Sequence, residues 1–363
     1  MKELRSRQIC FFFIAFLPVT KLFMMSSMVA KISNEDMWIS LLINVLIDFL
    51  TLLTLILFFN NNDKPFMDRL YEMLGKKPAD ALLILYAVYF ILKAVIPFNE
   101  QEGYVIQTLY LTMPNYFVFL PVFIVPVYLS LKKLRALGRC ADVVWIFTLI
   151  GLALIFALSI GNIRLDNLLP IGANKAGVIA KGAFQAVSWF GDCVYFMFLI
   201  GNYEKEKHST RNVLLSYGAS LISVLLFGVV FWCTFSSIAF RQRFALTEIS
   251  KYMTVINNIG RFDYLAIFFI LFSSVFALSL PVYFSSLIVR RVFNIDNKWI
   301  VPLCITLFIA IFSVILDRFI VTTENFILHK CGIFFLIFNN IIPVILTIIS
   351  RLSERRSYET QKN

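Results

Sequence analysis

The stretch Phe16-Leu17-Pro18-Val19-Thr20-Lys21 decides the fold, and it lies in the middle of an apolar run over residues 8–30. A helix that crosses a bilayer needs roughly 20 mostly apolar residues, and this run is long enough. Pro18 cannot donate a hydrogen bond to Ile14 and its ring crowds that carbonyl group, so a kink or a short unwound segment is expected. Lys21 then places an ammonium group near mid-membrane, where it needs water or a partner.

The composition shows that further membrane spans follow this one. The chain has 363 residues, of which 60% are hydrophobic and 15% charged, whereas a soluble domain is about 45–50% apolar and about 25% charged. Nine further apolar runs lie at residues 37–59, 80–110, 115–131, 141–161, 180–201, 212–237, 264–288, 299–316 and 332–350. We therefore expect an all-α polytopic membrane protein with ten transmembrane helices in one integral membrane domain, 1–363.

The basic residues are unevenly distributed over the connectors between these runs. The net charge of +11 comes from 33 Lys and Arg residues against 22 Asp and Glu residues, which in a soluble protein would suggest nucleic-acid binding. Of the 33, 21 lie on the side of the membrane that holds both ends of the chain. Because basic loops stay in the cytoplasm, both termini are expected there. The charge excess is a topology signal and requires no nucleic-acid partner.

The sixth run contains a second set of polar and helix-breaking residues. Gln185, Ser188 and Asp192 are spaced i, i+3, i+7, so a helix would place them on one face. Gly191 directly before Asp192 lets the backbone open. A purely structural alternative is that Asp192 is a buried carboxylate paired with a cation.

The two interrupted runs are the first and the sixth of ten. These are the positions at which a five-plus-five inverted repeat places its two discontinuous helices, whose broken midpoints face a substrate at the bilayer centre. The corresponding division is a first repeat over 1–161, a second repeat over 162–350 and a cytoplasmic tail over 351–363. The two runs together indicate this repeat better than either does alone.

A few other polar residues lie inside the runs. Asp48 and Lys93 are candidates for a proton relay or an ion pair, Tyr89 shares a helix face with Tyr86, and Ser274 either lines a polar path or packs against another helix. The candidate substrate-binding residues are Pro18, Val19, Thr20, Lys21, Tyr89, Ser188, Gly191, Asp192 and Ser274.

The chain has few residues of the kinds that bind metals or catalyse reactions. The six cysteines are scattered without a CxxC pair, and the two histidines are His208 and His329. Ten-span membrane acyltransferases commonly use a histidine near the first span as a base, but no histidine precedes His208 here. We expect no metal site, no cofactor and no enzyme activity.

Four stretches match the motifs of one membrane-protein family in order and spacing. Asp36-Met37-Trp38-Ile39-Ser40 resembles an acidic-Ala-Trp-Ile-Ser motif, and Asn162-Ile163-Arg164-Leu165-Asp166-Asn167-Leu168-Leu169-Pro170 is similar to that family's connector between spans five and six. Phe190-Gly191-Asp192 stands where the family has Phe-Gly-Glu, and Gly260-Arg261-Phe262-Asp263-Tyr264-Leu265 is similar to its Glu-Arg-Leu-Asp entry into the eighth span. The family is GerAB/ArcD/ProY, which comprises spore-germination proteins and amino-acid permease relatives.

This resemblance implies a LeuT-type fold of the amino acid/polyamine/organocation superfamily. Family members form the membrane-embedded B subunit of germinant receptors, beside A and C subunits. A pocket between spans one, three, six and eight is taken to receive a small germinant such as an amino acid. The resemblance also implies a location in the inner membrane of a bacterial cell or spore.

The chain departs from the family pattern in three places. The first break lacks the usual glycine and has Pro18-Val19-Thr20-Lys21 instead, Asp192 replaces a glutamate, and Met37 replaces an alanine. Lys21 either receives a ligand carboxylate or neutralises Asp192 or Asp48. We expect a germinant-receptor B subunit that binds a small solute. The alternative is an autonomous secondary amino acid transporter, with proton coupling as one option.

Overall fold

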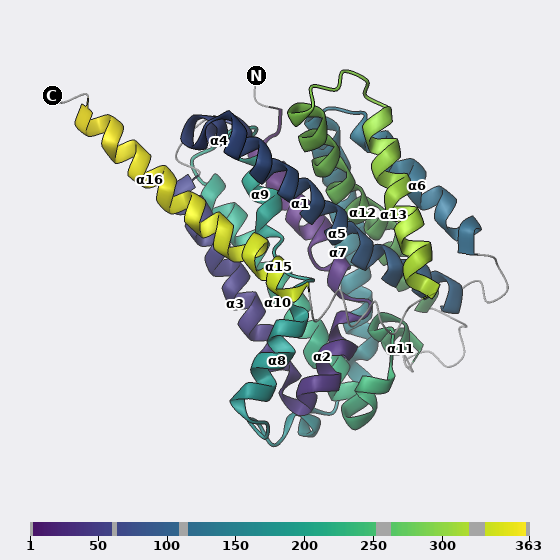
Figure 1. The fold of residues 1–363 in the computed structure, drawn as a ribbon. Coiled ribbons are helices and arrows are strands. Elements are labelled where there is room, and N and C mark those ends of the chain that lie inside the picture. The colour runs from purple at the N-terminus through teal and green to yellow at the C-terminus, as the bar shows by residue number, and fades with distance from the viewer. Residues whose placement is uncertain (1–2, 60–63, 109–114, 252–262, 319–330, 361–363) are drawn as a thin grey trace.

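The computed structural model describes residues 3–59, 64–108, 115–251, 263–318 and 331–360 (Figure 1). The described residues form helices and no named β-strand, with one isolated backbone bridge between Leu4 and Tyr203. The α-helices are α1 (Ser6–Phe16), α2 (Met25–Ser33), α3 (Met37–Thr54), α4 (Phe66–Leu74), α5 (Lys76–Thr108), α6 (Asn115–Ser130), α7 (Leu134–Ser159), α8 (Ala176–Ala186), α9 (Cys193–Leu199), α10 (Ser209–Phe235), α11 (Ala245–Lys251), α12 (Asp263–Val292), α13 (Ile300–Arg318), α15 (Gly332–Leu336) and α16 (Ile342–Thr360).

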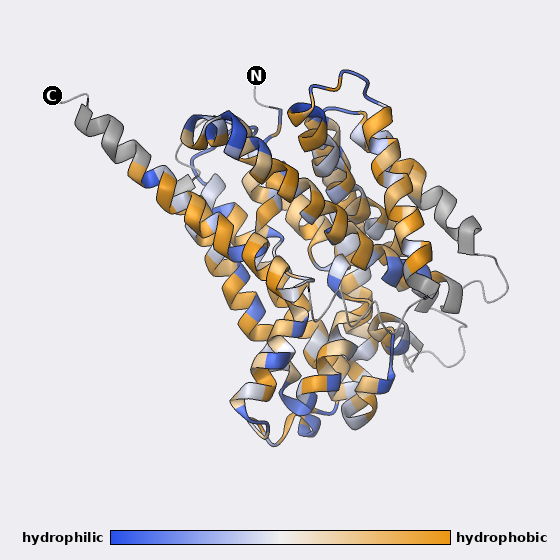
Figure 2. Cartoon of the chain, in the orientation of Figure 1, coloured by the Kyte–Doolittle hydropathy of each residue, from blue (hydrophilic) through white to orange (hydrophobic). Residues whose placement is uncertain are grey.

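Several of these helices have the length and composition of membrane spans. Six stretches of the described residues qualify: Met25–Leu57, Lys76–Val105, Leu134–Asn162, Ser209–Arg241, Tyr264–Val292 and Gly332–Leu352. Apolar residues run along the helices and hydrophilic ones gather mainly at the two ends of the bundle (Figure 2). Large apolar side chains also point outward, such as Leu50 on α3 and Leu307 on α13, which are 56% and 53% exposed. The chain is therefore an integral membrane protein whose outer faces contact lipid.

The first and the sixth predicted spans are each divided into two short helices. α1 is followed by the 3₁₀ turn η1 (Val19–Lys21) and then by α2, so the interruption predicted at Pro18 is present. α8 and α9 are separated by residues 187–192. An 11-residue helix such as α1 or α8 is only about 16 Å long, about half the thickness of the hydrocarbon layer. The chain therefore has backbone turns within the bundle at both places.

The divided helices are surrounded by longer ones. α1 packs against α7 and α10, while α2 and α3 pack against α8. α12 packs against α5, α6 and α7. Both ends of the chain, α4 and the α12–α13 connection lie at one end of the bundle, and α2 and α8 reach the other end (Figure 1). This packing keeps the two interruptions away from the outer surface.

Two helices lie in segments that the sequence analysis treated as connectors. α4 lies within 60–79 and α11 within 238–263. Both are too short to cross a bilayer, which takes roughly 20 residues. α4 buries Phe66 and Met67 and exposes Glu72. α7 also begins at Leu134, earlier than predicted, because the basic segment before its apolar run is already helical. The ten spans and the inverted repeat remain predictions. Residues 260–262, the first three of the motif that leads into the eighth predicted span, lie outside the described residues.

Asp36 ties the entry of α3 to the connector that leads into α8. Its carboxylate accepts hydrogen bonds from the backbone N–H groups of Gly172 (2.7 Å) and Asn174 (2.8 Å), and from the side-chain amide of Asn174 (3.1 Å). Ser40, at the end of the same motif, donates to the Ile179 carbonyl (2.9 Å). Asp36 and Ser40 therefore anchor the start of α3 to α8 and to the connector before it.

Replacing Asp36 tests this anchor. Asp36→Ala removes three hydrogen bonds to a charged acceptor and is expected to lower the free energy of unfolding by about 2–3 kcal/mol, measured by chemical unfolding of the detergent-solubilised protein. Asp166→Ala is the matched control, because Asp166 lies in the same connector and is exposed. Equal stability of the two variants would contradict the anchoring role.

Candidate binding site at the two helix interruptions

The first interruption leaves a backbone carbonyl free inside the bundle. α1 ends at Phe16, and in the 3₁₀ turn that follows the Lys21 N–H donates to the Pro18 carbonyl (2.9 Å) rather than to the Leu17 carbonyl four residues back. The carbonyl of Leu17 instead accepts hydrogen bonds from the Lys21 ammonium (2.9 Å) and from the Thr20 hydroxyl (3.2 Å). The polar side chains that follow the break thus satisfy the group that the break exposes.

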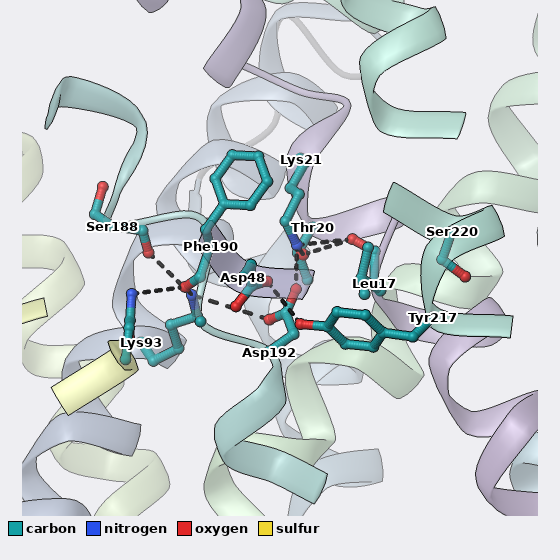
Figure 3. Close-up of polar contacts among 12 residues, drawn as sticks. Leu17, Thr20, Lys21, Asp48, Lys93, Ser188, Phe190, Asp192, Tyr217 and Ser220 are labelled. Atoms are coloured by element: carbon teal, nitrogen blue, oxygen red, sulfur yellow. Dashed lines mark hydrogen bonds and ion pairs between the residues drawn. The ribbon is translucent and has the colours of Figure 1, made fainter. Parts of the chain in front are cut away.

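Lys21 forms a buried ion pair with Asp192 across the two interruptions. Its Nζ bonds Oδ2 of Asp192, and the two side chains are 0% and 1% exposed (Figure 3). The Phe190 ring lies beside the ammonium, with 5.5 Å from Nζ to the ring centroid. Among the partners that the sequence left open for Lys21, the structure selects Asp192. Each charge compensates the other in a place that water does not reach.

The second interruption depends on a glycine. Gly191 has φ of +91°, a conformation that residues with a Cβ rarely adopt. A Cβ on Gly191 would also lie 2.1 Å from Cγ of Asn339. Gly191 therefore allows both the turn before α9 and the close approach of the asparagine. Asp192 follows directly and reaches Lys21 from the start of α9.

Lys93 from α5 satisfies the carbonyl groups that the second interruption leaves free. Its ammonium donates to the carbonyl of Ser188 (3.1 Å) and to that of Phe190, and it lies 4.0 Å from Oδ1 of Asp192 (Figure 3). A positive charge held by backbone carbonyls and a carboxylate is the arrangement in which unwound transporter helices coordinate a cation. Here the cation is a side chain of the protein.

Asn339 completes the hydrogen bonding of this segment from the π-helix η9 (Ile337–Ile341). Its amide nitrogen donates to the carbonyls of Val187 and Phe190, at 3.0 Å each. Its amide oxygen accepts a hydrogen bond from the Tyr89 hydroxyl (2.7 Å), which also lies 3.4 Å from the Gly191 carbonyl. The unwound backbone between α8 and α9 is therefore held by side chains of α5 and η9.

A second carboxylate lies near the ion pair. Asp48 on α3 accepts a hydrogen bond from the Tyr217 hydroxyl on α10 (2.6 Å) and interacts electrostatically with Lys21, Lys93 and Asp192. We name Lys21, Asp48, Lys93 and Asp192 the central charge cluster. Two ammonium groups and two carboxylates give it a net charge of zero when all four are ionised.

Within the described part of the chain, buried polar atoms on α3, α5, α8 and the second break lack hydrogen-bond partners. They include Oδ1 of Asp48, Oγ of Ser188, Oε1 of Gln185 and the Tyr86 hydroxyl. Buried polar groups are normally hydrogen-bonded to protein or water, so each of these atoms can take part in a further hydrogen bond. The cluster therefore offers hydrogen-bonding capacity as well as balanced charges.

The structure brings most of the predicted binding residues together. Pro18, Val19, Thr20 and Lys21 form the first break, Ser188, Gly191 and Asp192 the second, and Tyr89 contacts the second break through Asn339. Ser274 is buried, and its described hydrogen bond (2.6 Å) runs to Leu271 of its own helix. This bond within α12 does not distinguish a polar path from packing against another helix, so the role of Ser274 stays a prediction.

Two residues of the site were missed by the sequence analysis. Asn339 and Tyr217 lie in the tenth and seventh predicted spans, and neither was singled out. The signal available for Asn339 was the adjacent pair Asn339-Asn340 inside an otherwise apolar run. Tyr217 had no such signal, since a tyrosine in a membrane helix most often serves packing.

The fold and the buried charges define a helical integral membrane protein with a polar centre between two interrupted helices. A family model described as spore germination protein, of the spore permease type, matches residues 3–327. The chain therefore belongs to the spore germination protein family, as its motifs predicted. The search of curated proteins gave no match.

The charge balance of the cluster predicts how its variants behave. Lys21→Met leaves a net charge of −1 and Asp192→Asn leaves +1, so each is expected to destabilise the protein by about 3–5 kcal/mol. The double variant restores neutrality and should be more stable than either single variant, measured by chemical unfolding in detergent. Lys31→Met, at an exposed position of α2, is the control. Strictly additive effects of the two substitutions would reject the pairing.

The role of Asn339 can be separated from that of its neighbour. Asn339→Ala removes the two buried hydrogen bonds to the carbonyls of Val187 and Phe190 and the 2.7 Å acceptor of the Tyr89 hydroxyl. It is expected to lower the free energy of unfolding by about 1–3 kcal/mol. Asn340→Ala is the matched control, because Asn340 is half-buried and accepts one hydrogen bond, from Thr51 (2.9 Å). Thermal unfolding of the two variants side by side is the measurement, and equal melting temperatures would refute the assignment.

Proposed function

We propose that this chain is the membrane-embedded B subunit of a germinant receptor and binds a small solute, such as an amino acid, at the central charge cluster. The observation that carries the proposal is the buried Lys21–Asp192 pair at the meeting point of two interrupted helices, in a chain of the spore germination protein family. Binding, rather than catalysis, is the proposed activity.

The proposed architecture is a LeuT-like fold of the amino acid/polyamine/organocation superfamily, with ten spans in a five-plus-five inverted repeat. It is supported by the interruptions in the first and sixth predicted spans. The N-terminal end of the first span is also joined to the C-terminal end of the sixth, because the Leu4 N–H donates to the Asn202 carbonyl (3.1 Å) and the Glu204 N–H to the Leu4 carbonyl (2.9 Å). In this proposal both termini are cytoplasmic and the protein lies in the inner membrane of a bacterial cell or spore.

A zwitterionic solute matches the chemistry of the cluster. Its carboxylate would bind the Lys21 ammonium and its amino group the Asp192 carboxylate, so the ligand replaces an internal ion pair with two external ones. The polar atoms of Ser188 and Asp48 that lack partners would receive the remaining hydrogen bonds. Because the internal pair must open, binding is coupled to a movement of one interrupted helix relative to the other. In a receptor, that movement would be passed to the A- and C-type subunits.

The alternative is an autonomous secondary amino acid transporter that uses the same fold. The observation that favours it is Asp48 with its tyrosine partner Tyr217, since a buried carboxylate beside a substrate site is suited to carrying a proton. The two proposals differ in partners and in net transport. Co-purification with A- and C-type subunits supports the receptor, and uptake of labelled amino acid by liposomes that contain this chain alone supports the transporter.

Asp192→Asn tests the site in either case. One charge of the pair is lost, so the affinity for a solute that stabilises the wild type is expected to fall about tenfold or more. The measurement is a thermal-shift titration of the detergent-purified protein, after a screen of amino acids, sugars and nucleosides has identified the solute. Asp166→Asn, at the exposed connector position, is the control. An unchanged titration with normal expression would assign Asp192 to structure alone.

A further inference from the structure

A cavity of about 350 Å³ is lined by residues of the N-terminal segment, α4 and the α6–α7 and α12–α13 connections, and by none of the central charge cluster. In Figure 1, α4 and the α12–α13 connection lie at the end of the bundle that holds the chain termini. Its apolar lining includes Phe66, Phe198, Phe284 and Leu287. Ligand pockets are commonly of about 300–1,000 Å³ with a mostly apolar lining and a few placed polar groups. This cavity has the size of a small ligand or of a lipid headgroup.

Five basic residues from three separate segments line the same cavity. Lys132 and Lys133 come from the α6–α7 connection, Arg290 and Arg291 from the end of α12, and Lys298 from the α12–α13 connection. Glu3 is the acidic residue among the lining residues. Arg291 bonds Asp68 of α4, which leaves four lining cations for which the described part of the chain shows no ion pair. The cavity therefore carries a concentrated positive charge.

Backbone groups add to this charge. α7 has 26 residues and begins at Leu134, and both Leu134 and its N-cap residue Lys133 line the cavity. The N-cap makes no side-chain hydrogen bond, and the first turn of α7 contains no acidic residue. The free N–H groups at a helix start attract anions. Nε of Arg290 is buried and finds no hydrogen-bond partner among the described residues, so they offer this donor at the cavity no acceptor.

Aromatic residues place the cavity at the membrane–water boundary. The Lys132 ammonium lies over the Tyr128 ring, 4.5 Å from its centroid, and Tyr128 is 53% exposed. Trp299, next to Lys298, is 61% exposed. Exposed Tyr and Trp residues are enriched at the level of the lipid headgroups. The basic cavity thus lies where phosphate groups of the bilayer are found.

We propose that this cavity binds a phosphate group, with Lys133, Arg290 and Lys298 as its main ligands. An anionic phospholipid headgroup and a soluble phosphate ester share this chemistry, and basic pockets between membrane helices are known to hold anionic headgroups. The site is independent of the proposed solute site, since none of its lining residues belongs to the central charge cluster.

Native mass spectrometry of the full chain released from nanodiscs tests the proposal. Nanodiscs contain either phosphatidylcholine alone or phosphatidylcholine with phosphatidylglycerol. The test variant is Lys133→Gln/Lys298→Gln, because both side chains are exposed and the described residues give neither an ion pair, so folding should be preserved. The matched control is Lys76→Gln/Lys77→Gln, which removes the same charge from exposed positions at the start of α5.

The wild type and the control variant are expected to retain one phosphatidylglycerol molecule, and the test variant to retain at least fivefold less. Arg290→Gln, measured in the same way, should also lose retention. Equal retention by all variants would overturn a lipid site at this cavity. An equal loss in the test and control variants would overturn it as well, because the overall positive charge of the protein would then explain the binding.

A second experiment distinguishes a soluble phosphate ester from a lipid headgroup as the ligand of the cavity. Glycerol phosphate is titrated against the protein in phosphatidylcholine nanodiscs at constant ionic strength, and thermal stability is followed. A rise in melting temperature for the wild type and the control variant, absent from the test variant, assigns the cavity to a soluble phosphate ester. If neither lipid nor glycerol phosphate discriminates between test and control variants, the proposal is wrong.

Discussion

The ion pair between Lys21 and Asp192 is the interaction on which the centre of this protein depends. It joins the two places where membrane helices are interrupted, and both side chains are almost completely buried. A single charge at this depth in a bilayer would cost free energy, and each residue lowers that cost for the other by neutralising its charge. The proposed solute site follows from the same balance, since a zwitterion presents the two charges that the protein now supplies to itself.

The interrupted backbone imposes a second constraint, because every free carbonyl inside a membrane protein needs a donor. Lys21 donates to the Leu17 carbonyl, Lys93 to the carbonyls of Ser188 and Phe190, and Asn339 to those of Val187 and Phe190. Lys93 and Asn339 come from the third and the tenth predicted spans, whereas Lys21 belongs to the first break itself. The unwound segment between α8 and α9 is thus held by elements distant in sequence, so a movement there would disturb its hydrogen bonds with α5 and η9.

Local chemistry made part of this site predictable. A proline followed by a lysine, and a glycine followed by an aspartate, each interrupt an apolar run in a way that can be seen without a structure. The partner of Lys21 could not be chosen, because Asp48 and Asp192 are both carboxylates inside spans and their distance depends on packing. Asn339 was missed because its donors and acceptors matter only once the last helix lies against the second break.

The sequence by itself determined the membrane class, the positions of the helix interruptions and the family, because these follow from apolar run length, from residues that cannot continue a helix and from motif order. The tertiary structure alone decided which charges pair and which helices donate hydrogen bonds to the free carbonyls. It also decided that some of the basic residues which the sequence identified as a topology signal together line one cavity. The physical reason is that helix formation is local, whereas charge neutralisation and hydrogen bonding in an apolar interior depend on distances between residues far apart in the chain.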